Sequence, residues 1–184
     1  MMAVLFWPFV TAPAFQYTVA SYAVASVSVE PVQRAVVETL PRLKIPVINV
    51  DAKIDSMGVT KDGAMESPSG AQDVGWFAFG PRPGENGSAV LAGHYGRWKN
   101  GDVSVFDNLH TLQPGDKLYV QDKDGVTITF IVRQLRTYDK NDDTSQVFIS
   151  DDGVSHLNII ACAGVYDETL KTYSSRLVVF ADKQ

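Results

Sequence analysis

Short runs of apolar residues, separated by residues that form turns, make up most of the chain from residue 44 onward. The runs are rich in Val, Ile, Leu and Tyr and often alternate with polar residues, which is typical of β-strands with one buried face. Clusters of Gly, Pro, Asn and Asp between them supply the backbone conformations that turns need. The predicted strands are residues 44–50, 52–57, 88–94, 117–121, 126–135, 157–161 and 177–181. Seven or eight strands without long helices predict an all-β domain, either a closed barrel or a sandwich.

Two details refine this picture. Asp124 and Gly125 stand between the predicted strands 117–121 and 126–135, and Asp-Gly between β-prone runs is a strong signal for a hairpin. Helical spacing of apolar residues over 102–109, and an Asn/Asp-rich start before 143–149, predict two short helices.

The amino-terminal region has a different pattern. Residues 1–29 contain no charged side chain, and a helix of that length is long enough to cross a bilayer. Pro8 and Pro13 interrupt the run, and no Lys or Arg precedes it, so it does not follow the positive-inside rule. We expect residues 1–29 to be a membrane anchor or a cleaved export signal, residues 30–43 a linker, and residues 44–184 one catalytic domain.

Composition excludes several classes of function. The chain has 184 residues, of which 45% are hydrophobic and 20% charged, with a net charge of −5. This is the composition of an ordinary globular domain without the basic surface that nucleic-acid binding needs. A single cysteine excludes an internal disulfide and a structural zinc site built on several thiolates.

That single cysteine, Cys162, is the first candidate for chemistry because it ends the apolar run 157–161. A thiolate is a competent nucleophile when a base or a cation lies beside it and substrate can reach it. The alternative is a buried thiol that packs as a small hydrophobic residue.

Three histidines compete to be its base. His94 ends the run 88–94 and enters a loop rich in Gly and aromatic residues, and loops at the rim of a scaffold often carry function. His110 is expected at a helix end on the surface, and His156 at a strand edge. Arg176 starts the run 177–181, and its guanidinium suits a developing oxyanion, although a salt bridge at a strand end is the simpler role.

Several short segments occur in an order that resembles one family. They are Ile45-Pro46-Val47, Gly75-Trp76, Pro83-Gly84-Glu85, Ala92-Gly93-His94, Gly115-Asp116, Asp124-Gly125, residues 157–162 and residues 176–181. The ordered set resembles the sortases, cysteine transpeptidases of mainly Gram-positive cell surfaces, and is most similar to their class F.

The resemblance implies a closed eight-stranded sortase-type β-barrel with short helices, whose groove binds a sorting signal of the Leu-Pro-x-Thr-Gly type. Cys162 would be the nucleophile, His94 the general acid and base, and Arg176 the group that stabilises the substrate carbonyl and oxyanion. The acceptor would be an amine, from a cell-wall precursor or a pilin-type lysine. The enzyme would work at the extracytoplasmic face of the membrane without a cofactor or metal.

One position departs from the family, which usually has Thr before its cysteine, where this chain has Ala161. The alternatives left open are a weakly active or inactive peptide-binding module with the same fold, and a hydrolytic cysteine peptidase. Papain-like enzymes place Cys before His in the chain, the reverse of the order here. The acidic residues around the predicted helix 143–149 lack the spacing of a calcium loop and are expected to be a solvated surface. They are Asp139, Asp142, Asp143, Asp151 and Asp152.

Overall fold

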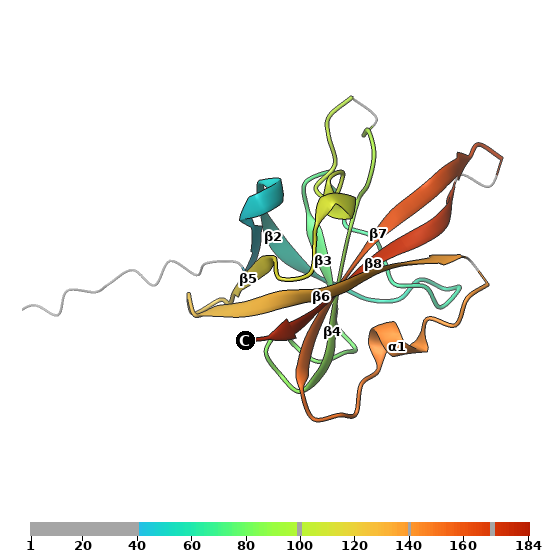
Figure 1. Cartoon of the computed structure of the whole chain (residues 1–184). Coiled ribbons are helices and arrows are strands. Elements are labelled where there is room, and N and C mark those ends of the chain that lie inside the picture. Colours follow the sequence, from blue (N-terminus) through green and yellow to red (C-terminus); the bar gives the residue numbers. More distant parts are fainter. Residues whose placement is uncertain (1–40, 99–100, 140, 170–171) are drawn as a thin grey trace, which may run out of the picture. The chain divides into compact units, whose positions relative to one another are not determined.

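The computed structural model describes residues 41–98, 101–139, 141–169 and 172–184. Eight strands close into a barrel in the order β1-β2-β3-β4-β7-β8-β6-β5 (Figure 1). The strands are β1 (Arg42–Ile45), β2 (Val50–Met57), β3 (Val74–Phe77), β4 (Gly87–Gly93), β5 (Lys117–Gln121), β6 (Thr127–Asp139), β7 (Ser155–Asp167) and β8 (Thr172–Lys183). The predicted closed all-β barrel is confirmed.

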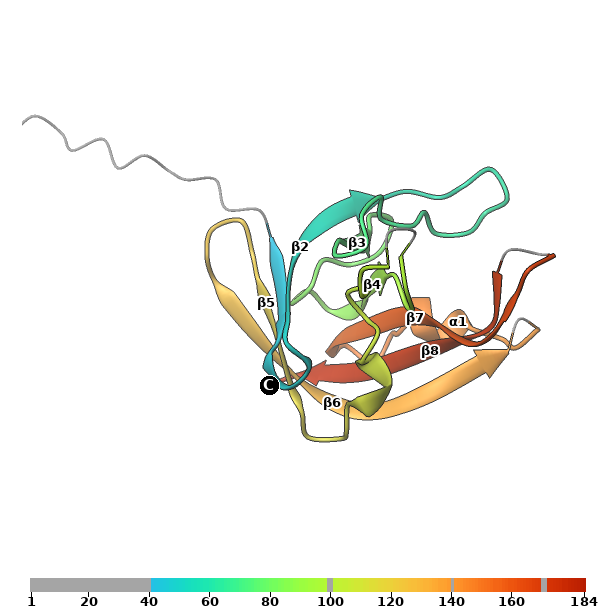
Figure 2. The ribbon, with the colours of Figure 1, turned by 90° about the horizontal axis from the view of Figure 1, so that it is seen from above.

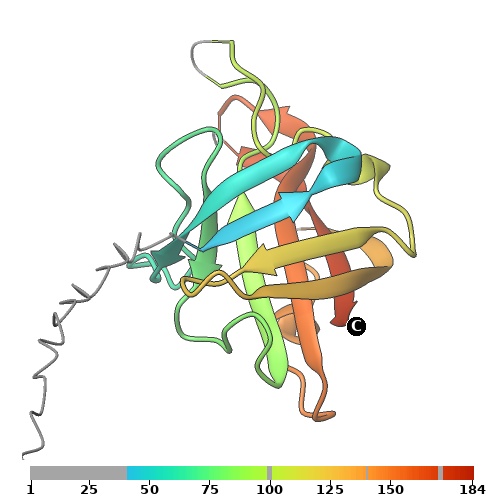
Figure 3. The ribbon, with the colours of Figure 1, turned by 90° about the vertical axis from the view of Figure 1, so that its left-hand side faces the viewer.

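Two of the eight strand pairings are parallel, β2 with β3 and β4 with β7. The β4–β7 pairing runs from Gly87 opposite Ser155 to Gly93 opposite Ala161, and the two strands lie side by side in Figure 3. Parallel strands end at the same edge of a sheet. The carboxyl end of β4 therefore meets β7 at one rim of the barrel, and the antiparallel partner β8 starts near that rim (Figure 2).

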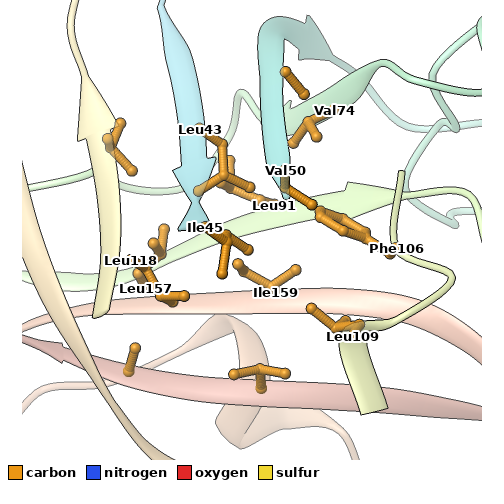
Figure 4. Packing of buried hydrophobic residues seen from close by; sticks show 14 of the residues in the cluster. Leu43, Ile45, Val50, Val74, Leu91, Phe106, Leu109, Leu118, Leu157 and Ile159 are labelled. Atoms are coloured by element: carbon orange, nitrogen blue, oxygen red, sulfur yellow. The ribbon is translucent and has the colours of Figure 1, made fainter. Parts of the chain in front are cut away.

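The main core fills the barrel with side chains from the strands and from the segment between β4 and β5. In β7 alternate residues Leu157, Ile159 and Ala161 belong to it, as the two-residue repeat of a strand requires. Figure 4 shows Phe106 and Leu109, from the segment between β4 and β5, packing into the same cluster as the strand residues. This segment therefore ties the loop that follows His94 to the core, because the amide of Phe106 donates to the carbonyl oxygen of His94.

A second, smaller cluster covers the outer face of β6, β7 and β8. Its buried members are Tyr138, Val147, Val178 and Phe180, with Phe148 and Ile160 packed against them. Val147 and Phe148 belong to the short helix α1 (Ser145–Phe148). Asn158 of β7 holds this helix because its buried amide Nδ2 donates to the carbonyl oxygen of Val147 at 2.7 Å.

The structure corrects several predicted elements. The run 44–50 is not one strand, because Pro46 starts a 3-10 helix (Pro46–Ile48) that separates β1 from β2. The predicted strands 157–161 and 177–181 are parts of the longer β7 and β8, and 126–135 overlaps β6, which starts one residue later and continues to Asp139.

Strand β3 was not predicted, since its four residues include a glycine and no alternation. The hairpin at Asp124-Gly125 is confirmed, with β5 and β6 antiparallel and Gly125 at φ 83°.

Of the two predicted helices, 143–149 contains α1, whereas 102–109 is wrong. Val105 and Phe106 reach the core from a series of turns, and the only helical element, a 3-10 turn at Leu109–Thr111, starts where the predicted helix ends. The barrel starts at Arg42, two residues before the predicted start of the domain.

The predicted anchor or signal, residues 1–29, lies outside the described residues. Within the described ranges, no helix has the length and apolar character needed to span a membrane.

Candidate active site

The strand pairing brings three of the sequence-predicted residues together. Gly93, the last residue of β4, is opposite Ala161, so His94 leaves β4 at the level where Cys162 continues β7. Cys162 is in turn the register partner of Arg176 on β8. Adjacent strands lie about 4.8 Å apart, so the three side chains come from neighbouring positions at one rim.

Cys162 and Arg176 share the outer face of the barrel. Their neighbours Ala161 on β7 and Leu177 on β8 contribute to the main core, and successive side chains of a strand point to opposite faces. Both residues are partly exposed. Cys162 is therefore not a core thiol, which was the alternative that its position in an apolar run had left open.

His94 is oriented by the loop before β3 and by its own loop. Its Nε2 lies 2.7 Å from the carbonyl oxygen of Pro68, and a carbonyl can only accept, so Nε2 carries a proton. The ring also packs on Trp98, with centroids 4.5 Å apart. The nitrogen left to exchange a proton is consequently Nδ1.

The backbone at and after His94 is tied down as well. The amide of Phe106 donates to the carbonyl oxygen of His94 at 3.0 Å, and that of Ser104 to the carbonyl oxygen of Gly96 at 3.2 Å. The amide of Gly96 donates to Oδ1 of Asp107 at 3.1 Å. The histidine loop is thus held by the same segment that enters the core at Phe106.

The guanidinium of Arg176 is bonded to its own hairpin. Nη1 donates to the carbonyl oxygens of Tyr173 at 3.1 Å and Ser175 at 2.9 Å, and Nη2 donates to Oγ1 of Thr172 at 3.2 Å. Within the described part of the chain no salt bridge includes Arg176. The guanidinium has five N–H donors, so it has capacity for a further acceptor.

Aromatic side chains that the sequence analysis did not select surround this rim. Tyr173 of β8 packs edge-on against Tyr95, with centroids 5.7 Å apart, and against Tyr166, 5.1 Å apart. A β-bulge between Ala163 and Tyr166 shifts the register so that Tyr166 faces Tyr173. The position of Tyr95 directly after His94 was the signal available in the sequence.

The other two histidines have structural roles. His110 is exposed, and its Nδ1 lies 3.2 Å from the carbonyl oxygen of Asp107. His156 is the second residue of β7 and is buried, with Nδ1 2.7 Å from Asp182 and Nε2 3.0 Å from Asp152. The amide of Val154 and then His156 lower the pKa of Asp152 to about 2.

Ala161, which stands where the family usually has Thr, is 2% exposed and packs in the main core. Its side chain therefore points away from the face that carries Cys162.

In the ranges that the structure describes, no group of three or more His, Cys, Asp or Glu side chains is placed to hold a metal ion. Asp139, one of the acidic residues considered for calcium, accepts a hydrogen bond from Ser175 at 2.8 Å.

A hollow of about 190 Å³ lies along the outer face of β7 and β8, beside α1. Its walls include Asn158, Phe180 and Ile149. Asn158 is four residues before Cys162 on the same face of the strand, so the hollow is on the surface that leads to the thiol.

The chain is similar to known proteins over almost the whole barrel. The sortase domain model matches residues 43–184. A search of curated proteins gives no significant match.

Solved structures with the same fold include the sortase D5 transpeptidase of Clostridium perfringens, at 21% identity and TM-score 0.58, covering 79% of this chain and 78% of that one. Sortase C-1 of Actinomyces oris matches at 24% identity and TM-score 0.60, covering 78% and 73%. Sortase C1 of Streptococcus agalactiae, in complex with MTSET, matches at 25% identity and TM-score 0.59, covering 80% and 68%.

These structures belong to classes D and C, so the class F assignment stays a prediction. The eight-stranded barrel and the match over residues 43–184 together show that this chain belongs to the sortase family of cysteine transpeptidases.

Proposed function

We propose that this sortase cleaves a sorting signal of the Leu-Pro-x-Thr-Gly type with Cys162 as nucleophile, and transfers the acyl group to an amine. The observation that carries the proposal is the strand register: Gly93, directly before His94, lies opposite Ala161, directly before Cys162, and Cys162 lies opposite Arg176. Nucleophile, proton carrier and fixed cation are the three groups that acyl transfer through a thioester requires.

In the first half of the reaction the thiolate of Cys162 attacks the carbonyl carbon of the signal's threonine. The carbonyl electrons move to oxygen, and the free N–H groups of Arg176 stabilise the resulting oxyanion. As the oxyanion collapses, the C–N bond to glycine breaks and His94 gives its Nδ1 proton to the leaving amine. The product is a thioester on Cys162 and a neutral imidazole.

In the second half an acceptor amine attacks the thioester. His94 Nδ1 takes a proton from the attacking nitrogen, and collapse of the second oxyanion expels the Cys162 thiolate. The donor's carboxyl group ends in a new amide bond, and the enzyme returns to its starting state. A cell-wall precursor or a pilin-type lysine would supply this amine.

The apolar part of the signal is expected to lie on the outer face of β7 and β8. Ile160 is two residues before Cys162, and Val178 two residues after Arg176, so both share the face of the reactive groups. Both belong to or pack against the cluster that contains α1. Val178 is already buried in that cluster, so the signal's Leu and Pro would bury apolar surface against the partly exposed Ile160 while the threonine carbonyl reaches the sulfur.

For location we propose the extracytoplasmic face of the membrane, where surface proteins and wall precursors meet. Residues 1–29, uncharged and apolar, would hold or deliver the enzyme there, either as an anchor or as a cleaved signal. Fractionating cells that produce the full chain and determining the mature amino terminus would decide between the two.

The deciding experiment is trapping of the acyl-enzyme. Residues 41–184 are incubated with a library of Leu-Pro-x-Thr-Gly peptides without an amine, and intact mass is measured. We expect an adduct equal to the peptide acyl group, absent from Cys162→Ala and released by an added amine as a new amide. A folded protein that forms no adduct with any peptide would overturn the proposed transpeptidase activity and favour a peptide-binding module. Release by water alone, with amines making no difference, would point to a hydrolytic peptidase.

A further inference from the structure

Tyr173 contacts both halves of the candidate site. It lies on β8 three residues before Arg176, opposite Tyr166. Its ring packs edge-on against Tyr166 on one side and against Tyr95, the residue after His94, on the other. T-shaped aromatic pairs at such centroid distances are favourable beyond the area they bury. Tyr173 therefore connects the β7–β8 hairpin to the histidine loop.

The phenol oxygen reaches the backbone of that loop at Gly96. A Cβ built on Gly96 would lie 2.7 Å from the hydroxyl oxygen of Tyr173, closer than carbon and oxygen approach without a bond. Gly96 also has φ +80°, a conformation that favours glycine. The close approach thus depends on the absence of a side chain two residues after His94.

Tyr173 also lies near the sulfur and the guanidinium. Burial raises the pKa of the Tyr173 phenol, and negative charge at Cys162 raises it further, followed by Tyr95, Tyr166 and Asp107. The Tyr173 phenol is therefore close enough to the Cys162 sulfur to interact with its charge. The carbonyl oxygen of Tyr173 accepts from Nη1 of Arg176 at 3.1 Å, so the same residue positions the cation through its backbone.

We propose that Tyr173 is a positioning residue that sets the distance between the His94 loop and the hairpin carrying Cys162 and Arg176. This inference rests on the proposed function, in which the Cys162 sulfur bonds to the substrate carbonyl carbon while His94 exchanges a proton with the amine of the same substrate. Proton transfer needs heavy atoms within about 3 Å of each other, and a misplacement of about 1 Å can cost about a hundredfold in rate. A side chain that holds both loops therefore controls the rate without touching the substrate.

The test uses the single cysteine as its own reporter. The rate of Cys162 alkylation by iodoacetamide is measured from pH 5 to 10 in the wild type, His94→Ala, Tyr173→Ala and the double variant, alongside acyl-enzyme formation and thermal unfolding. Tyr119→Phe on β5, away from the rim, is the control. We expect Tyr173→Ala to lower the acylation rate at saturating peptide at least about tenfold, with KM changed less. Adding His94→Ala to Tyr173→Ala should then change the alkylation profile little.

Two more variants keep the test sharp if Tyr173→Ala does not fold. Tyr173→Phe keeps the ring contacts and is expected to retain most of the rate. Gly96→Ala forces a methyl group against the phenol oxygen and should slow acylation, and adding Tyr173→Phe should restore part of the loss.

The outcomes separate the two ideas. If His94→Ala leaves the alkylation profile of the wild type unchanged, the pairing of His94 with Cys162 in the proposed function fails. If His94→Ala shifts the profile but folded Tyr173→Ala behaves like wild type in alkylation and acylation, the role of Tyr173 is refuted. It is also refuted if Gly96→Ala acylates at the wild-type rate.

Discussion

A methyl group added at Gly93 should damage both the core and the site. Gly93 ends β4 immediately before His94. A Cβ there would lie 2.5 and 2.6 Å from two ring carbons of Phe106 and 2.8 Å from Cγ1 of Val105. Non-bonded carbons prefer about 3.5–4 Å, so the Phe106 ring must move by about 1 Å. Phe106 is fully buried in the main core, so the ring has no free space to enter.

The expected cost follows from two opposing terms. Forcing an extra methyl group into a packed core typically costs about 1–3 kcal/mol. Replacing Gly by Ala within a strand recovers about 0.5–1 kcal/mol of backbone entropy. The difference spans about 0–2.5 kcal/mol, and because all three contacts are shorter than 3.0 Å we expect Gly93→Ala to lose about 1–2 kcal/mol of the free energy of unfolding. For a domain of this size that lowers Tm by about 2–8 °C.

The effect should also reach the chemistry. The amide of Phe106 donates to the carbonyl oxygen of His94, so displacing Phe106 displaces the histidine. We expect acyl-enzyme formation by Gly93→Ala to slow about tenfold or more at a temperature where the protein is fully folded.

Urea denaturation, thermal unfolding and acylation kinetics would measure these effects, with Gly80→Ala as the matched control. A Cβ at Gly80 would meet Phe77 at 3.4 Å, an ordinary contact, so that variant should stay within about 0.5 kcal/mol of wild type. Phe106→Leu should relieve the clash, so Gly93→Ala combined with Phe106→Leu should be more stable than the sum of the two single changes, by about 0.5–3 kcal/mol. The reasoning is refuted if Gly93→Ala is as stable as Gly80→Ala, or if the two changes are additive.

Three further predictions concern charges. His94→Ala should slow acylation by about 10²–10⁴ near neutral pH; a change below tenfold in stopped-flow acylation would contradict its role. Arg176→Lys keeps the charge but loses the planar fork, so the acylation rate should fall about ten- to a thousandfold while Cys162 alkylation is unchanged; equal rates would exclude oxyanion contact. Asp152 has a folded pKa of about 2, below its ordinary 3.8, so its stabilisation is present above about pH 4 and lost as pH falls toward 2. When the free energy of unfolding is measured as pH is lowered, Asp152→Asn should lose less stability than the wild type. An identical loss in the two proteins would contradict the prediction.

The local pattern of the sequence was sufficient for most strands. Alternating or continuous apolar runs and turn residues predict β5 to the residue and locate β4, β6, β7 and β8, because these strands are buried on one or both faces and have marked ends. The short β3, with Gly75 and no alternation, carries no such signal. The 102–109 segment has helical spacing, yet Phe106 is drawn to the core from a loop, since tertiary burial outweighs weak helix propensity.

The same contrast holds for the site. Sequence alone placed His94 and Cys162 at the ends of apolar runs and Arg176 at the start of another, and the order of motifs indicated the family. It could not show that Gly93 lies opposite Ala161, nearly seventy residues away, because a parallel pairing depends on the closing of the whole barrel rather than on local preference. Nor could it show which face of β7 carries the thiol. The tertiary structure decided both, and it also decided the contact of Tyr173 with Gly96. Residues distant in sequence come into contact only when the strands that carry them have paired.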